Sequence, residues 1–426
     1  MLHFIQGRPG GTMQPSVLER FAATRLTAVP ARKSKLIPWL LFAVFFCVYT
    51  LSLPVFSERF VSSLIFGADD MLDAYQGGRG RNLMEKHPLF IVVSGLYWLA
   101  GPLFSWAPAD IAYNLRMVFP VALLGAVSVC VARLVFLRSG ANEQQAVSFA
   151  VLYGVSGATW VFASFPETYM LTALCSNIFL WFILQTPRGP VAHHINRAAM
   201  LNALACCASP QQILLSLVPF VRWIGERQGL RSLIRRCVRY ALAMLALYFI
   251  PYEIYLKTVG RGWKFGPVYL QVYGRVEHLL DPRTAAVVAK NFVLYSVVPP
   301  AVTPRYFTDP SLSILRISPW GWIVVSGLFV SWCVYSVREL IGSPALKPAL
   351  AMAAFVCSYI VFFIYFNPTE AYLYTAPPLL AWLWILQGGF CRRWSRTRRN
   401  FLWLLTAAIV INNLQFRIYL QSIKLK

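Results

Sequence analysis

The segment LFIVVSGLYWLAGPLFSW, residues Leu89 to Trp106, decides how the rest of the chain is threaded through a membrane. If this segment crossed the membrane, the next apolar run (111–136) would place Arg133 and Arg138 outside. That arrangement contradicts the positive-inside rule, under which short cytosolic loops carry the excess of Lys and Arg. Its shortness, Pro102 and its Trp and Tyr content are typical of a helix in the interface plane. We therefore expect an interfacial helix at 89–106 on the outer surface.

The composition of the whole chain indicates a membrane protein. Of its 426 residues, 58% are hydrophobic, 15% are aromatic and only 13% are charged. This apolar content exceeds what a soluble core of the same length can use. A spanning helix needs about 20 mostly apolar residues, and the chain contains many such windows. The sequence predicts an all-α, polytopic transmembrane helical bundle of about 10–12 spans, with an external loop that carries interfacial helices.

The order of polar and apolar segments predicts the domain organisation. Residues 1–36 are basic and contain Pro and Gly, which favours a cytosolic tail before an uncleaved first span. Residues 37–426 are expected to form a single transmembrane domain with external segments at 57–110 and 259–319. Residues 198–221 have basic flanks and a break at Ser209-Pro210, which predicts two short helices or a re-entrant hairpin. The expected spans lie near 36–56, 111–137, 146–164, 168–186, 240–258, 320–337, 348–366 and 372–390, with a short segment from Phe401.

The net charge of +23 does not indicate nucleic-acid binding, because the arginines flank the predicted spans. Such clusters follow the positive-inside rule and also suit anionic lipid headgroups. The nine cysteines lack metal-ligand spacing and favour a role as small apolar fillers. His193-His194 is expected to be a solvated loop pair. We therefore predict no metal site built from these cysteines and histidines and no nucleic-acid partner.

A polar loop after the first span carries the strongest indication of chemistry. It reads FGADDMLDAY (66–75) and includes Asp69, Asp70 and Asp73; EKHPL follows at 85–89. Charges at a membrane surface mark a candidate functional site, although an ordinary solvated loop is an equal alternative. An Asp could act as general base toward an acceptor hydroxyl, contributing about 10²–10⁴-fold, while cations offset charge that grows on a leaving phosphate. The other substrate-binding candidates in this loop are Asp73, Arg79, Arg81, Glu85, Lys86 and His87, with Arg305 and Arg316 as distant cations.

Two further patches are expected on the same outer side, at 166–169 and 367–374. They add Glu167, Tyr169, Glu370 and Tyr372 to the candidate substrate-binding residues. Glu167 could instead be an acid facing the positive end of the next helix. The tyrosines could equally be interfacial anchors. Glu253, beside Pro251 within a predicted span, needs a partner or a cavity.

The acidic pair in the first external loop, followed by His-Pro-Leu before a surface helix, resembles the GT-C superfamily of polyprenyl-phosphate-sugar glycosyltransferases. Protein O-mannosyltransferases and the lipid A aminoarabinose transferase belong to this superfamily. The resemblance implies that Asp69 is the base, with Asp70 at the second acidic position. It also implies that Lys86, His87 and Pro88 contact the lipid phosphate or shape the site. Asp stands here where many members have Glu, which leaves the acceptor class and metal dependence open.

Together these features predict an inner-membrane, multi-pass glycosyltransferase with a cytosolic N-terminus and a site that faces the periplasm or exterior. The expected partners are membrane lipids, a polyprenyl-phosphate sugar donor and an acceptor that is a lipid, glycan or protein. The expected transfer is inverting and uses no cofactor, with the need for a divalent metal left open. A transporter or flippase of a lipid-linked or anionic substrate is one alternative. A surface-polysaccharide polymerase or ligase is another.

Overall fold

The computed structural model describes residues 35–52, 87–185, 190–226, 229–258, 274–299 and 319–422. All regular secondary structure in these residues is helical, which confirms the all-α class. The elements are α2 (Leu36–Leu51), η1 (Pro88–Phe90), α6 (Ile91–Leu103), α7 (Ala109–Arg138), α8 (Glu143–Val155), α9 (Gly157–Ser164), α10 (Tyr169–Ile183), α11 (Val191–Ala208), η2 (Pro210–Ser216), α12 (Leu217–Gly225), α13 (Leu230–Met244), η3 (Leu245–Phe249), α14 (Ile250–Thr258), α16 (Val276–Leu280), α17 (Pro282–Lys290), η5 (Asn291–Tyr295), α18 (Pro319–Leu340), α19 (Leu346–Phe366), η6 (Pro368–Tyr374), α20 (Ala376–Phe390), η7 (Cys391–Arg393) and α21 (Arg396–Ser422).

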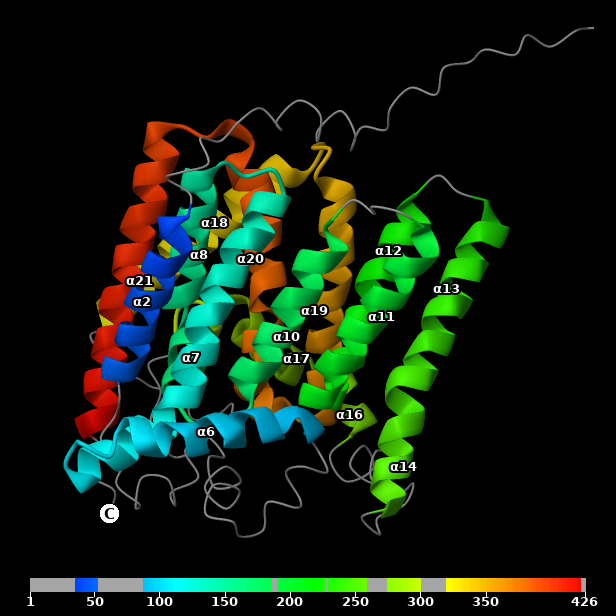
Figure 1. Cartoon of the computed structure of the whole chain (residues 1–426). Coiled ribbons are helices and arrows are strands. Elements are labelled where there is room, and N and C mark those ends of the chain that lie inside the picture. Colours follow the sequence, from blue (N-terminus) through cyan, green and yellow to red (C-terminus); the bar gives the residue numbers. More distant parts are fainter. Residues whose placement is uncertain are drawn as a thin grey trace, which may run out of the picture.

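Helix α7 lies at the centre of one half of the bundle, where it packs against α2, α8, α9 and α10 (Figure 1). The long helices run up and down along a common direction, whereas α6 lies crosswise at one end of the bundle. This end is called the α6 end below, and the other is the opposite end. A crosswise course is the one expected of an interfacial helix at 89–106.

Side chains fix α6 against α7. The guanidinium of Arg116 on α7 lies 4.0 Å from the ring centre of Tyr97 and 4.9 Å from that of Trp98. Its Nε also donates a hydrogen bond to the Tyr97 carbonyl at 3.2 Å. A cation over an aromatic face is attracted by the ring quadrupole. Arg116 therefore holds the crosswise helix at two adjacent positions.

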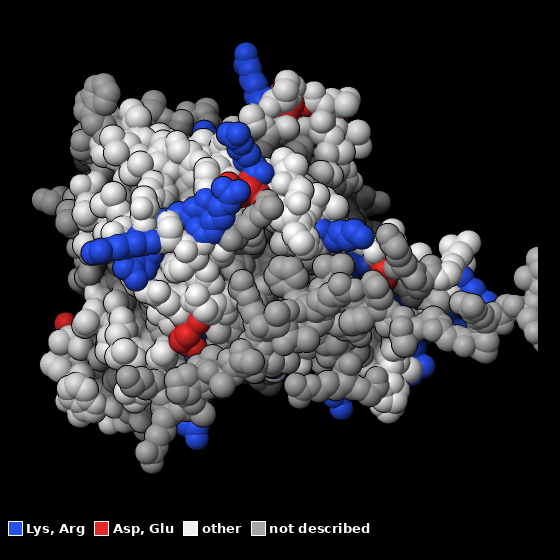
Figure 2. Space-filling model, turned by 90° about the horizontal axis from the view of Figure 1, so that it is seen from above, with Lys and Arg blue, Asp and Glu red and all other residues white. Residues whose placement is uncertain are grey.

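The outer faces of the helices are apolar. Trp39 is 72% exposed, and Ile323, Val334, Leu404 and Ile411 are also largely exposed. Large apolar surfaces of this kind belong in a lipid environment. Three described helices are long and apolar enough to cross a membrane, and the bent pair α8 and α9 would add a fourth. The membrane-protein class is thus supported, whereas the predicted count of 10–12 spans is not confirmed. The opposite end carries many Lys and Arg side chains (Figure 2).

The predicted span 146–164 consists of two helices, α8 and α9, bent by 59°. Asn142 and Gln145 form a capping box that starts α8. The bend lies at Ser156, where the backbone is extended. The amides of Gly157 and Ala158 then donate to the carbonyls of Val297 and Ser296, both at 2.9 Å, and not to α8. A distant segment therefore satisfies the first amides of α9 and separates it from α8.

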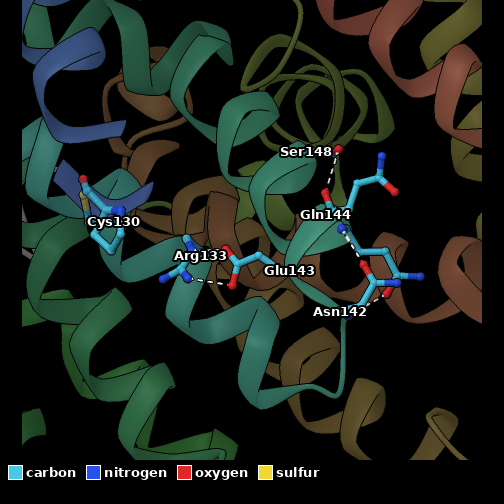
Figure 3. Close-up of polar contacts among 8 residues, drawn as sticks. Cys130, Arg133, Asn142, Glu143, Gln144 and Ser148 are labelled. Carbon is cyan, nitrogen blue, oxygen red and sulfur yellow. Dashed lines mark hydrogen bonds and ion pairs between the residues drawn. The ribbon is translucent and has the colours of Figure 1, made fainter. Parts of the chain in front are cut away.

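The turn between α7 and α8 is held by a two-pronged ion pair (Figure 3). Nε and Nη2 of Arg133 donate to the two carboxylate oxygens of Glu143 at 2.6 and 2.7 Å. The Arg133 side chain is 5% exposed and that of Glu143 is 25% exposed. A bidentate pair fixes direction as well as distance.

Removing only the acid, with Glu143→Ala, is expected to destabilise the protein by about 2 kcal/mol, because it leaves a buried arginine without its counter-charge. This destabilisation is smaller than that expected on breaking a fully buried ion pair, because Glu143 is partly hydrated. The double variant R133M/E143M should recover most of this loss. Thermal unfolding in detergent checks both values. A double variant no more stable than Glu143→Ala would contradict this account.

Other boundaries differ from the sequence prediction. The predicted break at Ser209-Pro210 is present between α11 and η2, but α11 begins at Val191. The expected loop pair His193-His194 is therefore helical, and the His194 ring stacks on Phe182 with centroids 4.6 Å apart. The short last segment is instead the 27-residue helix α21. The predicted span 240–258 begins earlier, at Leu230, and contains the π-helical turn η3.

Candidate active site

The acidic loop lies between two described residues, Ser52 and His87. The loop itself is outside the described part of the chain, and so are the distant cations Arg305 and Arg316. Ser52 and His87 are therefore the described residues at which the chain enters and leaves this loop. The predicted site residues that fall outside the described ranges are Asp69, Asp70, Asp73, Arg79, Arg81, Glu85 and Lys86.

The first anchor is Ser52, at the end of α2, which runs toward the α6 end (Figure 1). Its hydroxyl accepts a hydrogen bond from the indole Nε1 of Trp160 at 2.9 Å. Both side chains are buried, and Trp160 belongs to α9. The point at which the chain leaves α2 for the acidic loop is thus set by the position of α9.

The second anchor is His87, where the acidic loop ends and η1 begins. Its Nδ1 lies 2.8 Å from the carbonyl oxygen of Ala208, so the Nδ1–H donates to that carbonyl. Ala208 is the last residue of α11, and carbonyls at a helix end lack partners in the helix. Pro88 follows at the first helical position, where its missing amide has no cost. His87 therefore joins the end of the loop to the α11–η2 break.

Glu167 lies between α9 and α10 and is 5% exposed. Its Oε2 accepts the backbone N–H of Thr168 at 3.0 Å, just before α10 begins at Tyr169. Helix starts have amides without intrahelical partners and a positive end of the helix dipole, which favours an acid there. This contact supports the structural alternative for Glu167. The carboxylate is nevertheless held in place at the α6 end.

The patches at 166–169 and 367–374, far apart in sequence, meet through their aromatic rings. Phe162 of α9 lies 4.9 Å from Tyr169 and 5.8 Å from Tyr372, measured between ring centres. Tyr169 meets Tyr374 at 5.3 Å, edge to face, and Tyr374 stacks on Phe363 at 4.4 Å. Offset and edge-to-face pairs of this kind are favourable. Two of the three predicted patches therefore form one aromatic cluster.

Members of this cluster differ in how well they could meet a substrate. Tyr372 is 1% exposed, and burial raises the pKa of its hydroxyl above the ordinary value, so the group stays protonated. Tyr169 and Tyr374 are only half-buried. Tyr374, not among the predicted site residues, is thus better placed than Tyr372 to contact a bound molecule. Glu370 belongs to η6, and its side chain is not among those described.

A buried junction behind the cluster was not indicated by the sequence. The carbonyls of Ser296 and Val297, from the segment predicted as external (259–319), bond to the first amides of α9. On α21, Asn412 donates to the Pro299 carbonyl at 3.3 Å, and Asn413 donates to that of Val155. Polar side chains in an apolar helix commonly mark such contacts. The junction fixes α9, and with it the Trp160 anchor.

Polar side chains also fill the α11–η2 break. Ser176 of α10 donates to Oε1 of Gln212 at 2.7 Å, and Nε2 of Gln212 donates to the hydroxyl of Tyr359 on α19. All three residues are buried. Irregular backbone at membrane depth requires protein or water as a partner. Here α10 and α19 bond to the Gln212 side chain, and His87 supplies a partner for the backbone carbonyl of Ala208.

Within the described residues, no group of three or more His, Cys, Asp and Glu side chains could hold a metal ion. All nine cysteines are free thiols.

Comparisons with known proteins bear on the fold. No family model matches the chain, and no curated protein does. The crystal structure of ArnT from Cupriavidus metallidurans bound to undecaprenyl phosphate matches with a TM-score of 0.52 and 18% identity, covering 85% of this chain and 61% of ArnT. The apo structure of the same protein has a TM-score of 0.46 at 18% identity, covering 84% of this chain and 60% of ArnT.

ArnT is the lipid A aminoarabinose transferase, a GT-C enzyme. The chain therefore shares the fold of this GT-C enzyme, which confirms the expected resemblance at the level of the fold. It spans about three fifths of the length of ArnT.

Proposed function

We propose that the chain is a membrane glycosyltransferase that moves a sugar from a polyprenyl-phosphate carrier to an acceptor hydroxyl. The observation that carries this proposal is the fold shared over 85% of the chain with ArnT, whose crystal structure contains undecaprenyl phosphate. The acidic loop, anchored through Ser52 and His87 beside α9 and α11, supplies the chemistry that the fold alone does not specify.

The proposed reaction is a single in-line displacement. The Asp69 carboxylate takes the proton of the acceptor hydroxyl as its oxygen attacks the anomeric carbon. The bond from that carbon to the phosphate oxygen breaks on the opposite face, which inverts the configuration, and polyprenyl phosphate leaves. Lys86, with Arg79 and Arg81, offsets the charge that grows on the phosphate.

The aromatic cluster supplies the sugar or acceptor contacts in this proposal. Tyr169 and Tyr374 are half-exposed rings at the α6 end, and amphipathic rings of this kind bury an apolar face while their hydroxyls stay hydrogen-bonded. Of the two carboxylates in these patches, Glu167 is buried at the start of α10, so Glu370 remains the predicted carboxylate for sugar hydroxyls.

We place the α6 end on the periplasmic or exterior side. The opposite end carries the many Lys and Arg side chains in Figure 2, as the positive-inside rule expects of a cytosolic face.

A cysteine introduced with Ser105→Cys, just after α6, is therefore expected to react with an impermeant thiol reagent only from outside. Ser395→Cys, an exposed position before α21, should react only in inverted vesicles. Labelling is measured relative to the parent chain, which has nine cysteines of its own. Labelling of Ser105→Cys from the cytosolic side would reverse the orientation.

The test of the function uses the purified protein in proteoliposomes with a labelled undecaprenyl-phosphate sugar and envelope acceptors. We expect transfer of label to an acceptor and release of undecaprenyl phosphate. Parallel reactions with a chelator determine the metal dependence.

The same proteoliposomes distinguish a glycosyltransferase from the alternative functions. A transporter would move the intact donor across the bilayer without cleaving it, and that result would replace the proposal. A polymerase or ligase would use only lipid-linked oligosaccharide. The structure gives transport little specific support, because Gln212 is paired with protein groups and Glu253 lies 3.9 Å from Lys257.

A further inference from the structure

The helix α13 lies at the edge of the bundle and packs on one side only, against α11 and α12 (Figure 1). Its buried residues are Tyr240 and Met244, and the Tyr240 hydroxyl accepts a hydrogen bond from Asn202 of α11 at 2.8 Å. Nine of its fifteen residues are exposed. This exposed surface is where the helix meets its surroundings.

The exposed surface of α13 has two parallel rows. One row is apolar, with Leu230 71%, Ile234 52% and Val238 50% exposed. The other consists of Arg231, Arg235 and Arg239, also exposed. Residues four apart on a helix share a face and lie about 6 Å apart along its axis. A strip of positive charge therefore runs directly beside a strip of hydrocarbon.

The positive strip is not neutralised by the described part of the protein. The nearby carboxylate of Glu226 is already engaged, with Arg236 at 2.6 Å and Arg222 at 3.7 Å. Arg239 donates to the amide oxygen of Asn196, which is neutral. In the described residues from Val191 to Met244, Glu226 is the single carboxylate against six arginines, namely Arg197, Arg222, Arg231, Arg235, Arg236 and Arg239.

We propose that the exposed surface of α13 is a docking surface for an anionic phospholipid. A phospholipid joins an anionic phosphate to its acyl chains, so the headgroup can meet the arginine row while a chain covers the apolar row beside it. Arginine suits phosphate because its planar donors bind two oxygens together. An acidic cytosolic protein would also meet the arginines, but it would leave Leu230, Ile234 and Val238 exposed beside it. The lipid is thus the occupant that both rows favour.

The test measures binding of phosphatidylglycerol and phosphatidylcholine to the full chain, purified in detergent, by native mass spectrometry. The variant R231Q/R235Q/R239Q removes the row. Each arginine near an anionic headgroup contributes about fivefold in affinity, so this variant should bind phosphatidylglycerol about 100-fold more weakly. The variant with lysine at the same three positions should keep most of the affinity, because it keeps the charge.

A matched control removes three exposed charges at the α6 end, with K257Q/R275Q/R283Q. This control should bind phosphatidylglycerol as the parent chain does. An equal loss in the control would show an effect of total charge and overturn the proposal. So would equal binding of the two lipids by the parent chain, or displacement of phosphatidylglycerol by an equal concentration of soluble glycerol phosphate. None of these readouts depends on glycosyl transfer.

Discussion

Replacing Asp69 by Asn is expected to lower sugar transfer by at least about 100-fold while leaving the protein correctly inserted and folded. The amide has nearly the shape of the carboxylate but cannot take the proton of the acceptor hydroxyl, and general-base catalysis contributes about 10²–10⁴-fold. Because ground-state contacts to the donor are kept, the loss should appear in kcat more than in KM. Initial rates in proteoliposomes over a range of donor concentrations measure both constants.

Two companion variants sharpen this result. Asp69→Glu keeps a carboxylate and should keep part of the activity. Asp110→Asn removes an exposed acid in the first turn of α7, at the α6 end, and should have no effect. An Asp69→Asn protein that turns over at the parent rate would reject the base assignment. The same rate loss in Asp110→Asn would show that the assay responds to surface charge.

The sequence allowed the class of protein and several local features to be predicted because these depend on neighbouring residues. Proline at position 210 removes an amide and ends α11 where expected. The crosswise course of the segment 89–106 agrees with the sequence prediction. That prediction used the composition of the segment and its place between α2 and α7, where a further span would conflict with the positive-inside rule. The π-helical turn η3 and the bend at Ser156 left no comparable local pattern.

The missed features depend on contacts between distant residues. The bend between α8 and α9 exists because the carbonyls of Ser296 and Val297 bond to Gly157 and Ala158, some 140 residues away in the chain. Backbone groups carry no sequence signature, so this pairing could not be predicted. The adjacent residues Asn412 and Asn413 on α21 could have indicated a buried polar contact, since an amide side chain in an apolar helix needs a hydrogen-bond partner.

The residues of the candidate site were predicted from their chemical type, whereas the contacts between them were not predicted. Residue chemistry singled out the acidic loop and the two aromatic patches, and their common outer side followed from topology. The contact of Tyr169 with Tyr374 instead required α9 and α10 to meet η6, which in turn stacks on α19. Tyr374 was consequently left out of the predicted substrate-binding residues.

Replacing Gly389 by Ala is expected to destabilise the protein by about 3 kcal/mol or more, the upper end of the usual cost of overpacking. A Cβ added at Gly389 of α20 would lie 1.8 Å from the carbonyl oxygen of Ser336 and 2.7 Å from its carbon, both in the backbone of α18. A backbone carbonyl cannot change rotamer, so the two helices must move apart. That separation would also disturb the packing of Trp332 on Phe390, whose ring centres are 5.7 Å apart.

The adjacent glycine provides the control for this prediction. A Cβ at Gly388 would lie 3.4 Å from the end of the Leu340 side chain, which can shift, so Gly388→Ala should change stability by less than about 1 kcal/mol. The two variants have the same composition and the same helix propensity, and they differ only in which side of α20 gains the methyl group. Thermal unfolding in detergent, followed by the fraction of monodisperse protein, compares them directly. Equal unfolding temperatures for the two variants would show that Gly389 of α20 does not lie against the backbone of α18.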